Sequence, residues 1–547
     1  MKITSIRPDI LTIGDLYREH AFGLSIPSIQ RQFVWNDDDI KELLDSIING
    51  YPIGSIIIWE PDKSFPGVPL LGKSIPKNNE HKYVLDGQQR LTSLMLLLNN
   101  WSITRGSKTI NSSTFTYVPE NRKIYQGTSR GINLTTIVKA SLADAESLAT
   151  LQKSFSSNFT QIINEVGQKI VNYKIPIYSL KTISDEKDEA DNSVAYEVIA
   201  DIFTRVNAAG IKVGNLEMFL SFFAAHFPKE DKDKIIEMHE ELSELYELDL
   251  EPLVRFVFSL TNLTQNQITK VKSFKKAIQS LAVYLKDNNL NFQEILVKAR
   301  SAIKTSFEIL NKKFGLDSTK LIPSQIVLIP IFSHVYHRGY ESFSAIDTVE
   351  VDKISKWFLI SSFNTIYSSS TNKKLEEDLS LLLEVNTLFP LKHLLKNMKD
   401  RQPRRNDIIE SDIIDPRTNV LRGSSGKVYL MLLYIALINK KATDWAGRDI
   451  SSNNFTYQHI FPREYMRTKS EYGEDMINCL GNITLISRSV NSEISDTSPD
   501  NYLVNYDSSV IKAHMIPESQ SLWKIEKYEE FIERRLNLIW KEIKKLI

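Results

Sequence analysis

Apolar residues recur at spacings of three and four residues through the middle of this 547-residue chain, from about Leu142 to Lys399. Such spacing places them on one face of an α-helix, as in the stretches Val194 to Phe203, Leu216 to Phe227 and Ile235 to Leu248. This pattern constrains the fold more than any other feature, because it predicts helix for a long continuous part of the chain. The length also exceeds what one hydrophobic core accommodates, which predicts two or three domains. We therefore expect a mainly α protein with small β elements.

The charge balance and the cysteine content exclude several classes of protein. Lys+Arg and Asp+Glu both number 67, so the net charge is zero and any contact with DNA must come from a local basic patch. Cys479 is the one cysteine, which excludes a disulfide framework and a cysteine-ligated zinc site within the chain. The N-terminal stretch lacks the apolar segment of a signal peptide, and the longest apolar run, Val428 to Ile438, is too short to span a bilayer. We expect a cytoplasmic protein that does not associate with membranes.

The first hundred residues predict a small helix–strand–strand–helix unit. A first helix follows Asn36, a good N-cap, and ends at Gly50. The run Ile53 to Trp59 is rich in β-forming residues, and Tyr83 to Leu85 begins a second strand. The segment Arg90 to Leu98 then has the apolar content and the length of a helix.

The segment Val84 to Thr92 (VLDGQQRLT) places a tight Asp-Gly turn between the second strand and this helix. Free backbone N–H groups and the helix dipole favour an anion in the first helical turn, and Arg90 adds a bidentate phosphate donor. Asp86 would accept a hydrogen bond or hold a water-bound cation. The alternative is a capped structural turn with a surface arginine. The candidate phosphate-binding residues are Gln30, Arg31, Asp86, Gly87, Gln88, Gln89 and Arg90.

The segment Gly67 to Ser74 fits the P-loop pattern letter for letter. A P-loop opens into a helix, whereas here Pro76 and a polar stretch follow, and then a strand. Two leucines and a proline inside the segment also fit a phosphate cradle poorly. We interpret it as the loop that joins two strands.

The strongest chemical signal lies between Phe455 and Leu503. An extended stretch leads into His459, a loop brings Asn482 before the short strand Ile483 to Ile486, and Asn491 follows near a helical turn. The layout is strand, loop, strand and helix, with one histidine and two asparagines at its key points.

These residue types suit the hydrolysis of a phosphodiester, which needs a base for water and a divalent cation for the charge on the phosphate. Histidine titrates near neutral pH, so His459 is the candidate base. Amide and carboxylate oxygens suit Mg²⁺, so Gln458 and Asn491 are candidate ligands for Mg²⁺ or Mn²⁺. Asn482 would either orient the imidazole or tie the loop together.

Basic residues gather between Lys392 and Pro416, where the sequence becomes polar and contains prolines. Such a cluster just ahead of a catalytic segment would follow the phosphates of DNA, while the alternative is a solvated surface. The candidates for contact with the DNA backbone are Lys399, Arg401, Arg404 and Arg405. The change in composition also predicts a domain boundary, so we expect domains at residues 1–230, 231–395 and 396–547.

Together these motifs resemble those of the GmrSD-type modification-dependent (type IV) restriction endonucleases. On the N-terminal side the resemblance rests on the P-x-x-Q-R-x-x-V-W stretch that ends at Trp35, on DGQQRLTSL from Asp86, and on Phe203 to Gly210 (FTRVNAAG). On the C-terminal side, His459-Ile460-x-Pro462 with the two asparagines resembles the HNH (His-Me finger) endonucleases in their His-Asn-Asn variant.

The resemblance implies a ParB-like N-terminal module that binds NTP, a central helical region, and a C-terminal ββα-metal HNH finger embedded in helices. It makes His459 the general base and Asn491 a metal ligand. One departure is Gln458, because the family often has Asp or Glu there as a ligand, and a neutral side chain binds Mg²⁺ more weakly.

The resemblance also implies an activity: an NTP-regulated, metal-dependent DNA endonuclease of an antiphage restriction system, with NTPase activity, acting on modified phage DNA. GTP and ATP are not distinguished, and a homodimer is an open possibility. One alternative is a nucleotide-responsive DNA-binding regulator with a degenerate HNH domain. Another is an NTPase that acts on a protein partner.

Overall fold

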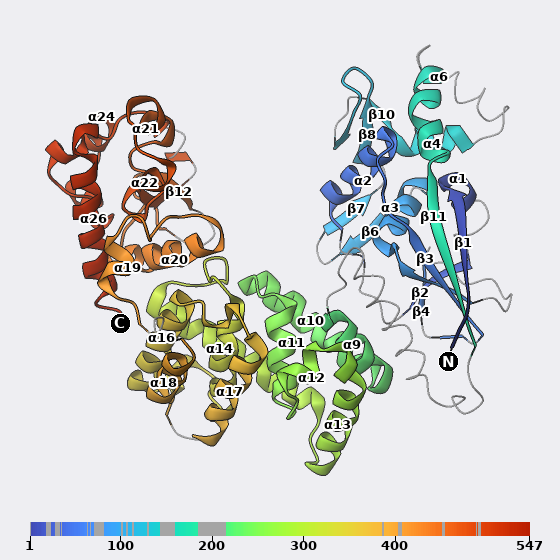
Figure 1. Ribbon diagram of the computed structural model, residues 1–547, viewed down its shortest axis with the longest axis horizontal. Coiled ribbons are helices and arrows are strands. Elements are labelled where there is room, and N and C mark those ends of the chain that lie inside the picture. Colours follow the sequence, from blue (N-terminus) through green and yellow to red (C-terminus); the bar gives the residue numbers. More distant parts are fainter. Residues whose placement is uncertain are drawn as a thin grey trace. The chain divides into compact units, whose positions relative to one another are not determined.

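The protein is described here by a computed structural model, shown in Figure 1. It describes residues 2–17, 23–27, 33, 35–62, 64–65, 67–70, 81–99, 102–105, 108–111, 114–127, 131–142, 159–183, 215–385, 388–402, 407–450, 455–487, 489–490 and 494–547. The chain divides into two compact units, one formed by residues 1–232 with 269–279 and the other by 233–268 with 280–547. Helices predominate and the sheets are small, which confirms the predicted fold class.

The first unit contains a six-stranded sheet. Its strands, in spatial order, are β1 (Lys2–Thr12), β11 (Lys174–Ile183), β3 (Ile56–Pro61), β5 (Lys82–Asp86), β2 (Leu24–Pro27) and β4 (Gly67–Pro69). The pairs β11–β3 and β5–β2 are parallel, and the other three pairs are antiparallel. Figure 1 shows β1 and β11 as a long ribbon at one side of this sheet.

Strand β11 lies within the part of the chain for which the sequence predicted helix, and there the prediction was wrong. Ile175 and Ile177 are buried while the residues between and beside them are exposed. Burial at every second residue is the pattern of a strand with one covered face.

Two smaller sheets complete the strands of this unit. They are β10 (Ile132–Asn133), β8 (Phe115–Val118) and β9 (Lys123–Gln126) in one, and β6 (Ser102–Arg105) and β7 (Lys108–Asn111) in the other. The helices that the structure describes between residues 1 and 228 include α1 (Ile13–Asp15), α2 (Asp37–Asn49), α3 (Gln88–Asn99), α4 (Leu134–Leu142), α6 (Phe159–Ile162), α7 (Gln168–Val171) and α9 (Asn215–His226).

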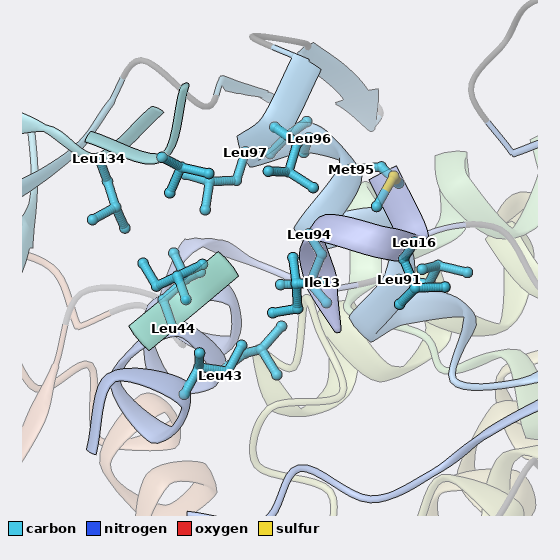
Figure 2. Packing of buried hydrophobic residues seen from close by; sticks show 14 of the residues in the cluster. Ile13, Leu16, Leu43, Leu44, Leu91, Leu94, Met95, Leu96, Leu97 and Leu134 are labelled. Atoms are coloured by element: carbon cyan, nitrogen blue, oxygen red, sulfur yellow. The ribbon is translucent and has the colours of Figure 1, made fainter. Parts of the chain in front are cut away.

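Helix α2 begins and ends where the sequence predicts. The Asn36 side chain accepts hydrogen bonds from the main-chain N–H groups of Asp38 and Asp39, and Gly50 ends the helix with a left-handed φ of 76°. Figure 2 shows its Leu43 and Leu44 among the buried apolar side chains of α3 and α4. This shared core holds α3, and therefore the turn before it, in place.

The central part of the chain is a succession of helices. They are α10 (Lys229–Tyr246), α11 (Leu250–Ser259), α12 (Gln265–Thr269), α13 (Phe274–Asp287), α14 (Phe292–Phe314), α15 (Ile329–Arg338), α16 (Thr348–Phe363), α17 (Thr371–Glu384) and α18 (Leu391–Arg401). The helices predicted from Leu216 and from Ile235 are confirmed as α9 and α10, whereas Val194 to Phe203 lies outside the described residues.

The C-terminal part surrounds a two-stranded sheet with helices. Its elements are α19 (Glu410–Ile414), α20 (Gly423–Asn439), β12 (Thr456–His459), α21 (Arg463–Lys469), α22 (Glu474–Ile477), β13 (Ile483–Ile486), α24 (Pro499–Tyr502), α25 (Ser508–Ala513) and α26 (Tyr528–Ile543). Strands β12 and β13 pair antiparallel, with His459 opposite Ile483. No helix among the described residues is long and apolar enough to cross a membrane, and the apolar run of α20 is buried core.

The turn that leads into β13 is held by α26. Arg535 is fully buried and donates hydrogen bonds to the carbonyls of Leu480 (3.2 Å) and Gly481 (2.9 Å). A Cβ on Gly481 would lie 2.9 Å from the side chain of Ile532, so the turn can approach α26 only with glycine there. This packing sets the position of Asn482 and of the strand that pairs with the His459 strand.

Candidate functional site

His459 is the last residue of β12 and is partly buried, on the same strand face as Tyr457. Its Nε2 lies 3.0 Å from Oδ1 of Asn478. Burial lowers the pKa of His459 below its usual 6.5, and this effect exceeds that of the hydrogen bond with Asn478, which raises it. The imidazole is therefore neutral near pH 7, which is the form that a general base needs.

Asn482 is fully buried and contacts the main chain of the loop. Its Oδ1 accepts from the N–H of Phe461 (2.8 Å), and its Nδ2 donates to the carbonyls of Phe461 (3.1 Å) and Ile477 (2.9 Å). The sequence left two roles open for Asn482: orienting the imidazole, or tying the loop together. The contacts in the structure are those that tie the loop. The partner of the imidazole is Asn478, so Asn482 is corrected from a catalytic candidate to a residue that holds the loop.

The side chain of Gln458 faces away from His459, because adjacent residues of a strand point to opposite faces. It is buried, with 6% exposed, and its residue pairs with Thr484. On that face the Thr484 hydroxyl donates to Nδ1 of His514 (2.6 Å). The strand geometry therefore places the Gln458 side chain on the face opposite the candidate base, and its role as a metal ligand stays a prediction.

The described residues contain part of the predicted metal site. Among them, no group of three His, Cys, Asp or Glu side chains is placed to hold a metal ion. The carboxylate in the cluster beside His459, Glu474, is bound by arginines. The other predicted ligand, Asn491, lies outside the described residues.

Sequence reasoning missed the polar cluster beside His459. Glu474 accepts from Nη2 of Arg463 (2.8 Å) and from Nε of Arg467 (2.7 Å). Asn478 donates from Nδ2 to the main-chain carbonyl of Glu474 (2.7 Å) and to its Oε2 (3.0 Å). Hydrogen bonds from Arg467 and Arg463 lower the pKa of Glu474 to about 2, so the carboxylate is charged. The available signal was the i, i+4 spacing of Arg463 with Arg467 and of Glu474 with Asn478, but only the folded loop joins these residues to the histidine.

The Asp86–Arg90 turn of the first unit has the predicted backbone. Asp86 ends β5, Gly87 has a left-handed φ of 87°, and α3 begins at Gln88. Arg90 is buried, and it donates from Nη1 to the carbonyl of Ile53 (2.5 Å) and from Nη2 to Oδ2 of Asp86 (3.1 Å). The chain itself therefore uses one hydrogen from each of these amino groups, and the role of Arg90 as a phosphate donor stays a prediction.

The other candidate nucleotide-binding residues are placed as follows. Gln88 and Gln89 are buried, and Oε1 of Gln89 accepts from the main-chain N–H of Trp35 (3.2 Å). Gln30 and Arg31 lie outside the described residues. Nucleotide binding at this turn therefore stays a prediction.

The P-loop-like segment begins as a strand. Gly67–Pro69 form β4, which pairs with β2, so the interpretation as a joining loop was wrong for these three residues. The cause is pairing with a strand distant in sequence, and residues 71–80 lie outside the described part.

Comparison with known families now adds to this geometry. The model of the GmrSD restriction endonuclease N-terminal domain matches residues 13–224, and that of the C-terminal domain matches residues 404–541. The chain belongs to the GmrSD restriction endonuclease family. A restriction endonuclease acts on DNA, so DNA is its substrate.

The GmrSD matches cover both sites described above. The N-terminal match contains the Asp86–Arg90 turn, and the C-terminal match contains β12, β13 and the cluster around His459. The chain is also similar to an uncharacterized protein of Methanocaldococcus jannaschii, with 24% identity over an alignment of 621 positions. That alignment covers 98% of this chain and 99% of the archaeal protein, so the similarity extends through the central helices of this GmrSD member.

The basic cluster at the start of the GmrSD C-terminal match is only partly open to DNA. Arg401 makes two hydrogen bonds with Asp378 (2.9 and 3.1 Å) and an ion pair with Glu377 (2.8 Å). These carboxylates occupy its guanidinium in the structure, and its role as a phosphate contact stays a prediction. Lys399 is exposed on α18, and Arg404 and Arg405 lie outside the described residues.

Proposed function

We propose that this GmrSD family member is an NTP-regulated, metal-dependent DNA endonuclease of the HNH type. We further propose that it serves an antiphage restriction system and cuts modified phage DNA. The observation that carries the nuclease proposal is the neutral His459 at the end of β12, held by Asn478 at 3.0 Å. A neutral imidazole in a fixed position is ready to accept a proton at physiological pH.

In the proposed reaction, His459 removes a proton from a water molecule. The water oxygen then forms a bond to the phosphorus, and the bond from the phosphorus to the 3′ oxygen breaks. Asn482 and Arg535 contribute indirectly, because they hold the loop and the turn on which β12 and β13 depend. Dependence on Mg²⁺ or Mn²⁺ rests on the family resemblance and on Asn491, since the described residues contain only part of the predicted metal site.

Regulation by nucleotide is proposed from the Asp86–Arg90 turn. The N-terminus of α3 follows Gly87 directly, and the first N–H groups of a helix favour phosphate. Because Arg90 is bound to Asp86 and to the carbonyl of Ile53, a phosphate would be held by the main chain or would exchange with the Asp86 carboxylate. NTPase activity belongs to the same proposal, and it leaves the choice between GTP and ATP open.

The decisive experiment is cleavage of modified phage genomic DNA and unmodified plasmid DNA by wild type and His459→Ala. Each reaction is run with Mg²⁺, with Mn²⁺ and with EDTA, and with or without GTP or ATP. His393→Ala serves as a matched control, because His393 is an exposed histidine on α18. We expect cutting that needs the metal and His459, and equal cutting by the two enzymes would overturn the proposal.

A second candidate is a nucleotide-responsive DNA-binding regulator with a degenerate HNH domain. Gln458 favours it, since the residue next to His459 is neutral and its side chain faces the other side of β12. Nucleotide and DNA binding by wild type, without cleavage under any of these conditions, would support this candidate.

A further inference from the structure

We propose that Asn478 is a positioning residue that fixes His459 in the tautomer with hydrogen on Nε2, so that Nδ1 is the atom that takes the proton from water. This role rests on the proposed function of His459 as the base. It adds which ring nitrogen of His459 accepts the proton and which side chain fixes the imidazole in that tautomer.

The direction of the Asn478 amide follows from its contacts with Glu474. Its nitrogen lies 2.7 Å from the main-chain carbonyl of Glu474 and 3.0 Å from Oε2 of the same residue. Both of these oxygens only accept hydrogen bonds, because the carboxylate is charged. An amide turned the other way would place its oxygen against two acceptors, so Oδ1 is the atom that faces the imidazole.

The tautomer of His459 follows from that direction. An amide oxygen accepts and does not donate, so Nε2 at 3.0 Å must carry the hydrogen. A neutral imidazole has one N–H group, and Nδ1 therefore keeps its lone pair. Among the described residues, the structure gives Nδ1 no hydrogen-bond partner.

Asn478 is itself held at both its main chain and its side chain. Its carbonyl accepts from the N–H of Leu421 (2.9 Å). Glu474, which accepts from the Asn478 amide, is bound in turn by Arg463 and Arg467. These ion pairs are partly exposed and contribute little to stability, but they fix the direction of the carboxylate.

His514 in the same unit shows the contrasting arrangement. Its Nδ1 accepts from the Thr484 hydroxyl (2.6 Å) and its Nε2 donates to the carbonyl of Thr443 (2.7 Å). Both nitrogens are used within the protein, as expected of a structural histidine. His459 uses Nε2 on Asn478, which leaves Nδ1 for a substrate water.

The test combines cleavage kinetics with a direct measurement of the tautomer. In single-turnover cleavage, Asn478→Ala should lower the rate about 10- to 100-fold with little change in DNA affinity, as is usual when a residue that orients a catalytic group is removed. Asn501→Ala is the matched control, because Asn501 is exposed and its side chain donates to the nearby Ser498 hydroxyl.

Histidine ¹⁵N NMR of the full chain, with the His459 signal assigned through His459→Gln, should show hydrogen on Nε2 in wild type and a mixture of tautomers in Asn478→Ala. A wild-type signal with hydrogen on Nδ1, or wild-type cleavage by a folded Asn478→Ala protein, would overturn the role of Asn478. Equal cleavage by wild type and His459→Ala would instead overturn the proposed function, so the two failures are distinguishable.

Discussion

The two regions that carry the GmrSD motifs use their polar residues in opposite ways. At the Asp86–Arg90 turn the long side chains are buried, and Arg90 bonds to the carbonyl of Ile53 and to Asp86. At the end of β12, His459 is only partly buried, and one of its two ring nitrogens forms a hydrogen bond with Asn478. The difference teaches that the folded chain can bind a motif side chain through the groups that would contact a ligand, as at Arg90, or leave a functional atom available, as at Nδ1 of His459.

The largest effect that tests this contrast is on catalysis at His459. Replacement of the base by alanine should lower cleavage by about 10²–10⁴-fold, because general-base catalysis contributes that much. Thermal unfolding should change little, since the imidazole is not part of the buried core. A large loss of stability with little loss of cleavage would mean that His459 supports the fold and is not the catalytic base.

Arg90→Ala should mainly lower the stability of the fold, in contrast to the change at His459. It removes two hydrogen bonds and leaves the carbonyl of Ile53 and the Asp86 carboxylate without this partner. We expect a loss of about 3 kcal/mol in the free energy of unfolding, measured by urea denaturation of the full chain. Arg90→Lys is the control, because it keeps a donor of the same charge. A variant that binds no nucleotide but unfolds like wild type would identify Arg90 as a ligand-binding residue instead.

Protonation of His514 should weaken the protein in acid. Burial lowers the pKa of His514 from 6.5 to about 4. The unfolded chain therefore takes up the proton first, and stability is lost as pH falls from about 6.5 to about 4. The loss approaches about 3 kcal/mol, since each pKa unit corresponds to about 1.4 kcal/mol.

Urea denaturation at several pH values tests this window. His393→Gln serves as the matched control, because His393 is an exposed histidine on α18. A free energy of unfolding that stays flat between pH 7 and pH 5 would contradict the structural role of His514.

The smallest effect is expected at Arg463. Its ion pair with Glu474 is at the surface, with 47% and 36% of the two side chains exposed, so Arg463→Gln should change stability by less than about 1 kcal/mol. Differential scanning calorimetry would detect a larger change. A loss of several kcal/mol would mean that the cluster beside His459 stabilises the core of the fold, rather than only orienting Asn478 toward the imidazole.

Local patterns were enough to predict much of the fold. The cap at Asn36 and the stop at Gly50 placed α2, and the Asp-Gly turn placed the start of α3. The strand Ile483–Ile486 and the extended stretch before His459 were also predicted from the sequence. These features depend on residues within a few positions of one another, where propensity and capping decide the backbone.

Other parts of the site could not be predicted in this way. Asn478 lies 19 residues from His459, and only the loop that Asn482 ties brings their side chains together. Arg401 belongs to a basic cluster of the kind that contacts phosphate. In the structure it pairs with Asp378, 23 residues away on another helix. Helical periodicity also missed β11, whose place between β1 and β3 joins distant parts of the chain.

The sequence by itself determined the GmrSD family, the mainly α fold class and the position of the candidate base. The tertiary structure alone decided which polar groups are already satisfied: Arg90 and Arg401 within the protein, Gln458 on the far face of its strand, and Asn478 against the imidazole. The physical reason is that a side chain's availability depends on burial and hydrogen-bond partners. Those partners come from packing between segments that lie far apart in the sequence.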